Sequence, residues 1–340
     1  MGTTIRDVAK LAGVSASTVS RVLNHKSVIS PETSEKIRKA MRDLNYVPND
    51  LARGLAKATS HVIGLAVDTR SPEDYSNRFF NRTVFALEAV AQEKGYNLMI
   101  VNADLREQKN RSILRLVSGK KLDGLIIPEK LANTHLLMEL RKADFPFVIL
   151  GKQDEPELAT WVDIDNIQAG QIAAKHLLTK GYHQICFLTN AKNQLFEKER
   201  IYGFIGEMER KSISKDRYSV LEGGHEAQEI ELFLRKINPT EQKTVACLCS
   251  NDRIAASVVH KARDLKISLP EAVGVLCFDN TDITEFLDPS ISCIDVDTYE
   301  AGAQAADILL NQIKERDHKY RHILIPTRVI ERHTTARKEA

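Results

Sequence analysis

Apolar residues recur every three or four positions through the first 46 residues, which is the spacing of a helix face that packs against a core. Gly13 and the polar stretch before Pro31 divide this pattern into three short segments. We therefore expect residues 1–46 to form an all-α head of three helices. The apolar faces comprise Ile5, Val8, Ala9 and Leu11; Val19, Val22 and Leu23; and Ile37, Ala40, Met41 and Leu44.

The polar residues at the starts of these segments are suitable helix caps. Thr4 precedes the first segment, and Asp7 three residues later completes a partial capping box. Ser15 precedes the second segment, and Ser30 followed by Pro31 opens the third, where both residue types are favoured. A helix, a short turn that contains Gly, and a second helix are the plan of a helix-turn-helix.

From residue 61 onward the pattern changes to short apolar runs, each followed by a helical pattern. Strands that alternate with helices predict a parallel sheet covered by helices on both faces. A second series begins near Ala169, so we expect an α/β body of two doubly wound parallel-sheet subdomains with a ligand cleft between them. The expected strands are HVIGLAVD, YNLMIVN, LDGLIIP, FPFVILG, ICFLT, YSVLEG, TVACLCS and VGVLCFD.

Between head and body, the stretch VPNDLARGLA (residues 47–56) reads as a very short helix with a Gly in its interior. Such a helix is marginal in water, and an interior Gly costs it about 1 kcal/mol relative to Ala. We therefore expect this stretch to form a helix only with help from a partner.

Net charge separates the head from the body. Residues 1–60 hold ten Lys or Arg and five Asp or Glu, a balance of +5; because the whole chain carries +2, the remainder carries −3. A basic head on a slightly acidic body favours a nucleic-acid-binding module, although basic helix faces are often merely solvated.

Composition narrows the class of protein further. With 43% hydrophobic and 28% charged residues, no run long enough for a membrane span and no apolar signal core at the N-terminus, the chain is expected to be globular, cytoplasmic and without a membrane partner. The spacing of the five cysteines matches no zinc or redox motif, so buried free thiols are favoured over a metal site, and we expect no cofactor. The cysteines are Cys186, Cys247, Cys249, Cys277 and Cys293.

The outward side of the second helix has the chemistry of a major-groove reader. Its small polar start would allow close approach, Arg21 can pair bidentately with guanine, Ser17 can bond to either base type, and Ala16 can touch a thymine methyl. Thr4, Ser15, Thr18, Ser20 and Asn24 suit phosphates, which position the protein without specifying sequence. The alternative is a generic three-helix bundle with a polar surface.

The stretch TIRDVAKLAGVSASTVSRVLN resembles the DNA-binding head of the LacI/GalR family of bacterial transcriptional regulators, and the likeness continues through ISPETSEKIRKAMRDLNYVPNDLARGLA and more loosely to the end. The resemblance implies a helix-turn-helix domain at 1–46, a hinge helix and linker at 47–60, and a periplasmic-binding-protein-like core at 61–340. It places the N-subdomain at about 61–161 and 291–322 and the C-subdomain at about 162–290 and 323–340. In the hinge, Leu55 would wedge into the minor groove, Arg53 would contact phosphate, and Asn49 and Ala52 would also contact DNA.

The same resemblance, together with polar residues at strand ends, predicts an effector site. Arg, carboxylates, an amide and aromatic rings suit a sugar-like ligand, through bidentate bonds to hydroxyls and stacking on the ring. Each residue has an alternative: Asp252 as a helix cap, Arg200 as a surface residue, and the two phenylalanines as plain core. The candidates are Phe79, Phe80, Asp165, Arg200, Asn251, Asp252 and Asp279.

The resemblance implies a homodimeric repressor of a carbohydrate operon that binds a palindromic operator as double-stranded DNA and responds to a sugar or sugar phosphate. WVDIDN and ERIYGF look most like the maltose-operon repressor branch. A catabolite-control-type global regulator with a protein corepressor is disfavoured, because Asp307 and Asn311 stand where that regulator has basic residues and a negative charge repels phosphoserine.

Two other classes of protein fit the sequence less well. The chain has no GxSxG, HExxH, P-loop or GxGxxG motif, and the HEAQE stretch at His225 lacks the second His of a zinc site, so we expect no enzyme. A sugar-binding protein without a DNA role would share the body, but the head and the missing export signal argue against it.

Overall fold

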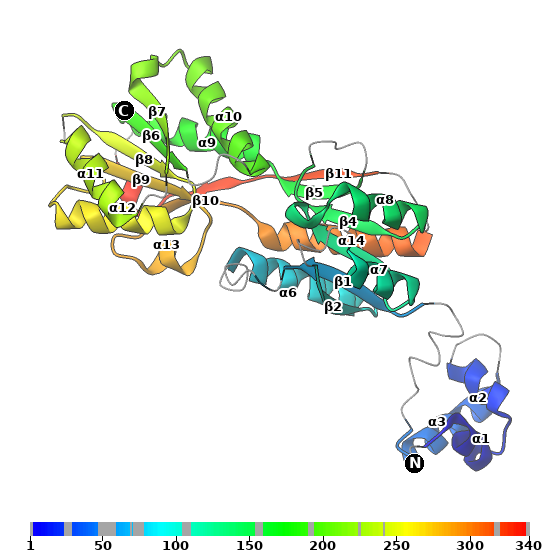
Figure 1. Cartoon of the computed structure of the whole chain (residues 1–340). Helices are drawn as coiled ribbons and strands as arrows, with labels where there is room; N and C mark the ends of the chain where they lie inside the picture. Colours follow the sequence, from blue (N-terminus) through cyan, green and yellow to red (C-terminus); the bar gives the residue numbers. More distant parts are fainter. Residues whose placement is uncertain are drawn as a thin grey trace. The chain divides into compact units, whose positions relative to one another are not determined.

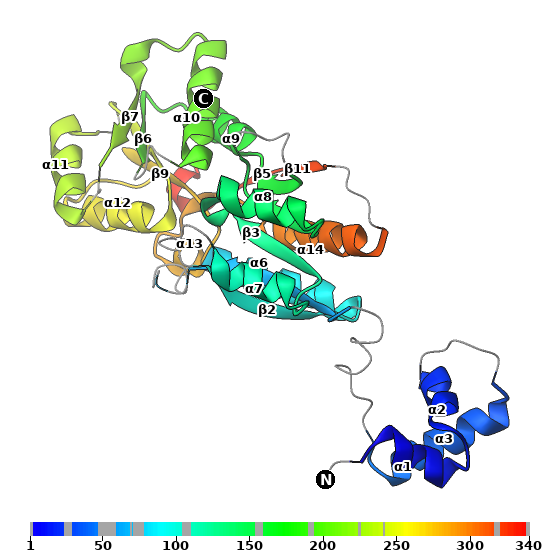
Figure 2. The ribbon, with the colours of Figure 1, turned by 45° about the vertical axis from the view of Figure 1, so that its right-hand side comes forward.

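The structure is a computed structural model of the 340-residue chain, and it describes residues 3–23, 29–46, 59–68, 70, 78–103, 110–153, 159–189, 194–223, 226–240, 242–315 and 320–337. The chain divides into two compact units, Met1–Ser60 and His61–Ala340. Figures 1 and 2 show the helical first unit in blue and the α/β second unit in the remaining colours.

The first unit is the expected three-helix head. The Oδ2 of Asp7 accepts hydrogen bonds from the backbone N and the hydroxyl of Thr4 at 2.8 and 2.7 Å, which closes the start of the first helix. Gly13 then adopts the left-handed conformation (φ 66°) that ends it, and the Thr33 N–H donates to the Ser30 hydroxyl at 3.3 Å to cap the third. The helices are α1 (Ile5–Ala12), α2 (Ala16–Leu23) and α3 (Pro31–Asp43), and their buried core is Val8, Ala9, Val19, Ile37 and Ala40.

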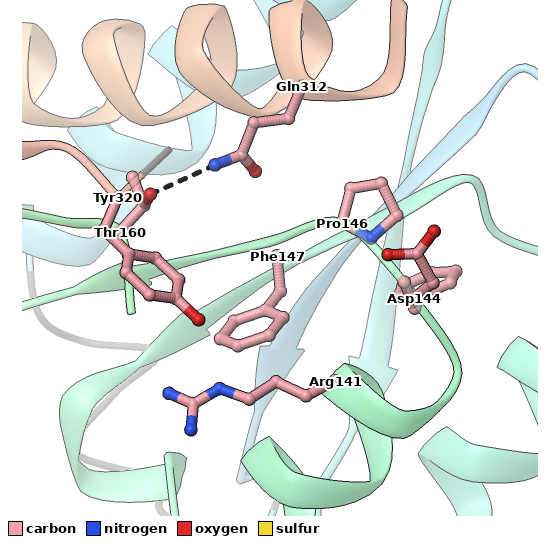
Figure 3. A pocket seen from close by; sticks show the side chains of 8 residues that line it. Arg141, Asp144, Pro146, Phe147, Thr160, Gln312 and Tyr320 are labelled. Carbon is pink, nitrogen blue, oxygen red and sulfur yellow. Dashed lines mark hydrogen bonds between the residues drawn. The ribbon is translucent and has the colours of Figure 1, made fainter. Parts of the chain in front are cut away.

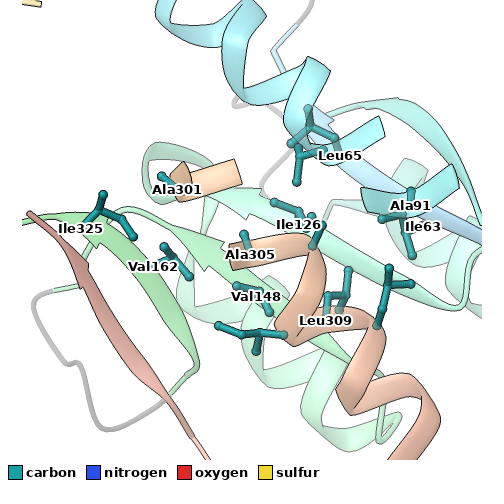
Figure 4. Close-up of a cluster of buried hydrophobic side chains, with 14 of the residues drawn as sticks. Ile63, Leu65, Ala91, Ile126, Val148, Val162, Ala301, Ala305, Leu309 and Ile325 are labelled. Atoms are coloured by element: carbon teal, nitrogen blue, oxygen red, sulfur yellow. The ribbon is translucent and has the colours of Figure 1, made fainter. Parts of the chain in front are cut away.

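The first sheet of the second unit has the strand order β11-β5-β4-β3-β1-β2, and all its pairings are parallel. Helices α6 and α14 cover one face, where Leu65, Ile126 and Leu309 are buried together (Figure 4), and α7 and α8 cover the other. The strands are β1 (Val62–Val67), β2 (Asn97–Asn102), β3 (Gly124–Pro128), β4 (Phe147–Leu150), β5 (Trp161–Ile164) and β11 (His322–Ile325). The helices are α6 (Arg78–Glu93), α7 (Arg111–Ser118), α8 (Thr134–Lys142) and α14 (Thr298–Glu315).

The second sheet repeats this plan in the order β12-β10-β9-β8-β6-β7, with one antiparallel strand at the edge, β12. Helices α9 and α10 cover one face, and α11 and α12 cover the other. The strands are β6 (Gln184–Thr189), β7 (Tyr218–Glu222), β8 (Val245–Cys249), β9 (Val273–Phe278), β10 (Ser292–Asp295) and β12 (Arg328–Ile330). The helices are α9 (Asn166–Thr179), α10 (Leu195–Arg210), α11 (Ala227–Ile237), α12 (Asp252–Asp264) and the short α13 (Asp282–Phe286).

These two sheets confirm the expected architecture of two doubly wound subdomains, but the chain crosses between them later than the sequence suggested. Strand β5 pairs with β4 and β11 in the first sheet through Ile164, so a boundary at 161/162 would cut it. Strand β10 belongs to the second sheet, so the N-subdomain does not resume at 291, and β11 keeps residues 323–325 in the first sheet. The physical reason is that a strand leaves its sheet only where its ladder of hydrogen bonds ends.

All five cysteines are free and buried, as expected, and they share the face of the second sheet that α11 and α12 cover. Cys249, Cys277 and Cys293 lie side by side on β8, β9 and β10, and Cys186 pairs in register with Cys247. Burial raises the pKa of each of these thiols above its ordinary value. Separately, no helix among the described residues is both long and apolar enough to cross a membrane.

Candidate functional site

The candidate nucleic-acid interface is the outward side of α2. Of the residues from 16 to 21, Val19 alone is fully buried in the core of the head. Ser17 and Arg21 are exposed, and the residues between and beside them are half-exposed: Ala16, Thr18 and Ser20. Helix α2 therefore offers short side chains and one guanidinium, with no bulky apolar group on this side.

Hydroxyl groups organise the start of α2. The Ser15 hydroxyl lies 2.7 Å from that of Ser17 and 2.8 Å from that of Thr18, and it accepts the Thr18 N–H at 3.1 Å. This N-terminal turn holds the small polar side chains in one place, as phosphate contacts require. Thr4 is exposed at the start of α1, with its hydroxyl bonded to Asp7. Asn24, Asn49, Ala52, Arg53 and Leu55 lie outside the described residues.

The second candidate site is a polar cluster at the carboxyl ends of three neighbouring strands of the second sheet, β9, β8 and β6. Thr189 ends β6, Ser250 follows β8, and Asp279 follows β9. Strand β7 lies on one side of β6, and the next strand along the chain, β8, lies on the other side. The carboxyl ends of β6 and β8 are therefore at a topological switch point, where open sheets bind ligands.

Asp279 is held in a conformation that few residues adopt. Its φ is +76°, in the left-handed region, and its backbone N–H donates to the Ile294 carbonyl at 3.1 Å, so the main chain fixes where the carboxyl group points. Its Oδ1 is buried and has no hydrogen-bond partner in the described part of the chain. A buried carboxylate oxygen without a donor is costly, and a ligand hydroxyl would satisfy it.

Arg200 on α10 is buried and lies at the centre of the cluster. Its Nε donates to the Asn166 Oδ1 at 3.0 Å, and its guanidinium carbon lies 4.3 Å from the ring centroid of Phe278 and 4.9 Å from that of Phe196. Two aromatic rings and one amide therefore fix the guanidinium, so it is preorganised for a ligand.

Three buried or half-buried carboxylates near Arg200 were missed by the sequence analysis. Glu197 accepts the Thr189 hydroxyl at 3.0 Å, Glu199 pairs with the Lys152 Nζ at 2.5 Å, and Asp163 accepts the backbone N–H of Lys152 at 3.1 Å. Glu197 precedes Arg200 by three residues, a spacing that puts both on one side of a helix, and this was the available signal.

Burial governs the ionisation of the cluster. It raises the pKa of Asp279 to about 6, with Asp252 and Glu197 adding repulsion and Arg200 opposing the shift. It likewise raises the pKa of Asp163 to about 6 and the pKa of Glu197 above its usual value. The cluster therefore holds several carboxyl groups around a small number of cations.

The other residues expected to bind an effector have structural roles in this conformation. Asp165 caps α9 by accepting the Gln168 N–H at 3.0 Å, and Asn251 caps α12 by accepting the Ile254 N–H at 3.0 Å. Asp252 accepts the Thr281 hydroxyl at 2.6 Å, and it begins α12 without being its cap. Phe80 is half-buried against the core of the first sheet, and Phe79 lies in α6.

Comparison with known proteins adds the family. The model described as "Bacterial regulatory proteins, lacI family" matches residues 4–49, and that described as "Periplasmic binding protein-like domain" matches residues 174–335. The HTH-type transcriptional repressor PurR of Vibrio atlanticus (strain LGP32) is 30% identical over 336 residues, which cover 97% of this chain and 98% of that protein. PurR of Vibrio vulnificus (strain CMCP6) is 32% identical over 94% of each chain.

Solved structures of other transcriptional regulators have the same fold. The lac repressor dimer bound to operator and the anti-inducer ONPF matches with a TM-score of 0.80 at 24% identity, over 98% of this chain and 99% of that one. The probable maltose operon transcriptional repressor MalR from Staphylococcus aureus matches with a TM-score of 0.70 at 20% identity, over 82% of this chain and 99% of that one. At these identities the likeness shows the fold alone.

A helix-turn-helix unit followed by a periplasmic-binding-protein-like core defines a class of bacterial transcriptional regulators and not a class of enzymes. The chain belongs to the LacI family of bacterial regulatory proteins, and it is a DNA-binding transcriptional repressor.

Proposed function

We propose that this repressor binds a palindromic operator as a homodimer and that a small, uncharged polyhydroxyl molecule, a sugar in a carbohydrate-utilisation system, controls that binding from the polar cluster. Residues 47–60 would act as the hinge between head and core, and the exposed side of α2 would read the operator. One observation carries the effector proposal: the guanidinium of Arg200 acts electrostatically on Asp279, whose buried Oδ1 has no hydrogen-bond partner among the described residues, at a switch point of the second sheet.

The charge of the cluster supports an uncharged ligand. Glu197 and Asp252 both repel the charge on Asp279, and Arg200 opposes the raised pKa of Asp279 and of Glu197. Lys152 is already paired with Glu199. A phosphate group brought into this surplus of carboxyl groups would be repelled, whereas sugar hydroxyls can donate to carboxylates and accept from arginine.

Structures of related fold hold sugars. One is a complex of the transcriptional regulator CelR with cellobiose, and another is a LacI family regulator from Enterococcus faecium with bound ribose. Both are under 25% identical to this chain, so they support the class of ligand without identifying it.

The surroundings of Asp307 speak against a phosphorylated protein corepressor. Asp307 forms an ion pair with Lys94 and accepts the Asn311 side-chain N–H at 2.9 Å. Lys94 is thus already paired with a carboxylate and is not available to a phosphoserine. The negative charge of Asp307 would itself repel a phosphoserine.

A thermal-shift screen with neutral sugars, sugar phosphates and nucleobases tests the proposal, because a ligand that binds only the folded state raises the melting temperature. We expect neutral sugars to give the largest shift, and the same compound to change the affinity for a labelled operator. Arg200→Ala should abolish both effects, whereas Arg235→Ala, an exposed arginine on α11, should keep them. Larger shifts with sugar phosphates, or an unchanged response in Arg200→Ala, would contradict this assignment.

A further inference from the structure

A separate cavity of about 210 Å³ lies at the amino ends of β4 and β5 in the first sheet. Phe147 is the first residue of β4, Thr160 directly precedes β5, and Gln312 reaches the cavity from α14. The polar cluster described above lies at the carboxyl ends of strands of the other sheet. The two sites therefore share no residues, and a ligand could bind in this cavity whether or not the polar cluster takes an effector.

Arg141, on the last turn of α8, lines this cavity, and two of its nitrogen atoms, Nε and Nη2, are buried without a hydrogen-bond acceptor among the residues that the structure describes. These two N–H groups lie on the same edge of the guanidinium, which is the edge that pairs with both oxygens of a carboxylate. Leaving them unsatisfied costs free energy that a planar oxyanion would restore.

The rest of the wall is aromatic and already ordered. Phe145 and Phe147 line the cavity, and the guanidinium carbon of Arg141 lies 5.9 Å from the ring centroid of Tyr320. The Gln312 side-chain N–H donates to the Thr160 hydroxyl at 3.1 Å, which ties α14 to the start of β5 (Figure 3). The wall therefore offers apolar ring faces beside one cationic edge.

Asp144 is the one carboxylate in the described lining, and its position matters because it would repel an anion. Figure 3 shows its carboxyl group beside Pro146, on the other side of Phe147 from the guanidinium of Arg141, which extends toward the hydroxyl end of Tyr320. The ring of Phe147 would thus separate a ligand bound at the Arg141 guanidinium from the carboxyl group of Asp144.

We propose that this cavity is a second binding site, which takes a small organic carboxylate with a compact apolar body. The carboxylate bridges Nε and Nη2 of Arg141, and the apolar part packs against Phe147 and Tyr320. A cavity of about 210 Å³ has room for a ligand with a single ring or a short chain.

Benzoate is a suitable probe, because it joins a carboxylate to one ring. We expect saturable binding of benzoate to the full chain by calorimetry, with a change in the fluorescence of Trp161, the only tryptophan, which directly follows Thr160. Arg141→Gln should weaken this binding about tenfold or more, and Arg141→Lys should also weaken it, since lysine keeps the charge but loses the fork. Circular dichroism establishes that both variants fold.

Two controls distinguish binding at Arg141 from binding elsewhere on the chain. Benzyl alcohol has the same ring without the charge and should bind at least about tenfold more weakly than benzoate, because it cannot pair with the guanidinium. Arg200→Ala alters only the polar cluster of the second sheet and should bind benzoate as the wild type does. No saturable binding to the wild-type protein, equal binding of benzyl alcohol, or full affinity in both folded Arg141 variants would each overturn the proposal.

Discussion

At the scale of single residues, the polar cluster depends on groups whose surroundings oppose their charge. Asp279 combines a left-handed backbone, a buried oxygen without a donor in the described ranges and a pKa of about 6. Perturbed carboxyl groups of this kind gather at functional sites because binding, and not folding, selects them.

Replacing Asp279 tests how much stability the folded protein loses when this buried carboxyl group ionises. Its pKa is higher in the folded protein than in the unfolded chain, so the folded state binds more protons and the free energy of unfolding falls as pH rises from about 4 to about 6. Asp279→Asn should remove this fall, which amounts to on the order of 1–2 kcal/mol between pH 5 and pH 7.5. Urea unfolding at pH 5 and pH 7.5 measures it, and the exposed Asp288→Asn should leave the wild-type pH dependence intact.

Sequence reasoning found Arg200 and Asp279 by their motifs, and the structure brings them together. It missed Glu197 because the fold buries that side chain beside Thr189 at the end of β6, and the local pattern of α10 does not show this burial. Asp165 at the crossover and Asn251 at the end of a strand are predicted ligands, but both cap the helix that follows, and one sequence cannot distinguish a cap from a ligand there.

At the scale of elements, the close approach of α9 and α10 positions the cluster. A Cβ atom at Gly203 would lie 2.0 Å from the Ile167 carbonyl oxygen, and one at Gly170 would lie 2.1 Å from the carbonyl oxygen of Arg200. Glycine at both contacts lets the two helices meet backbone to backbone, which brings Asn166 within hydrogen-bond reach of Arg200.

Gly203→Ala should therefore push the helices apart. We expect a loss of about 2–3 kcal/mol in the free energy of unfolding, typical of overpacking, and a weaker effector response because Arg200 moves with α10. Gly206→Ala on the same helix is the matched control: nothing lies within 4 Å of the position that its new methyl group would take, so it should be neutral or stabilise by up to about 1 kcal/mol. Equal losses in the two variants would disprove the packing argument.

The hydrophobic pattern predicted the three head helices and the strands β1–β4 and β6–β9, because burial on one or two faces sets the period of each element. It did not predict β5, β10, β11 or β12. It misplaced the crossovers, because the lengths of β5 and β11 depend on their mutual pairing, for example Ile323 with Val162, which lie far apart in the sequence. The hydrophobic pattern of one segment does not show which distant segment it pairs with.

At the scale of the whole molecule, the chain joins a basic head to a slightly acidic core. The basic head should make operator binding depend on salt. Attraction to phosphates falls steeply with salt, whereas base contacts determine specificity. Affinity and specificity can therefore be changed separately.

Arg21→Ala makes the separation measurable. It should lower the preference for the operator over a variant with one altered guanine by about 1–3 kcal/mol, with little change in the salt dependence of binding. Arg42→Ala, an exposed arginine on α3 that pairs with Glu35, should keep the wild-type preference. Electrophoretic shifts between about 50 and 200 mM salt give both quantities. An unaltered base preference in Arg21→Ala would remove this residue from the reading surface.

The row of buried thiols beneath α11 and α12 has a practical consequence for studying such coupling. Thiolates are the reactive form, and burial keeps all five native cysteines protonated and out of reach of reagents. The natural sequence is therefore already suited to selective labelling with maleimide dyes. Cysteines introduced at exposed Lys39 in the head and Lys236 in the core would accept a donor and an acceptor fluorophore, and energy transfer between them would report how operator and effector change the separation of the two units.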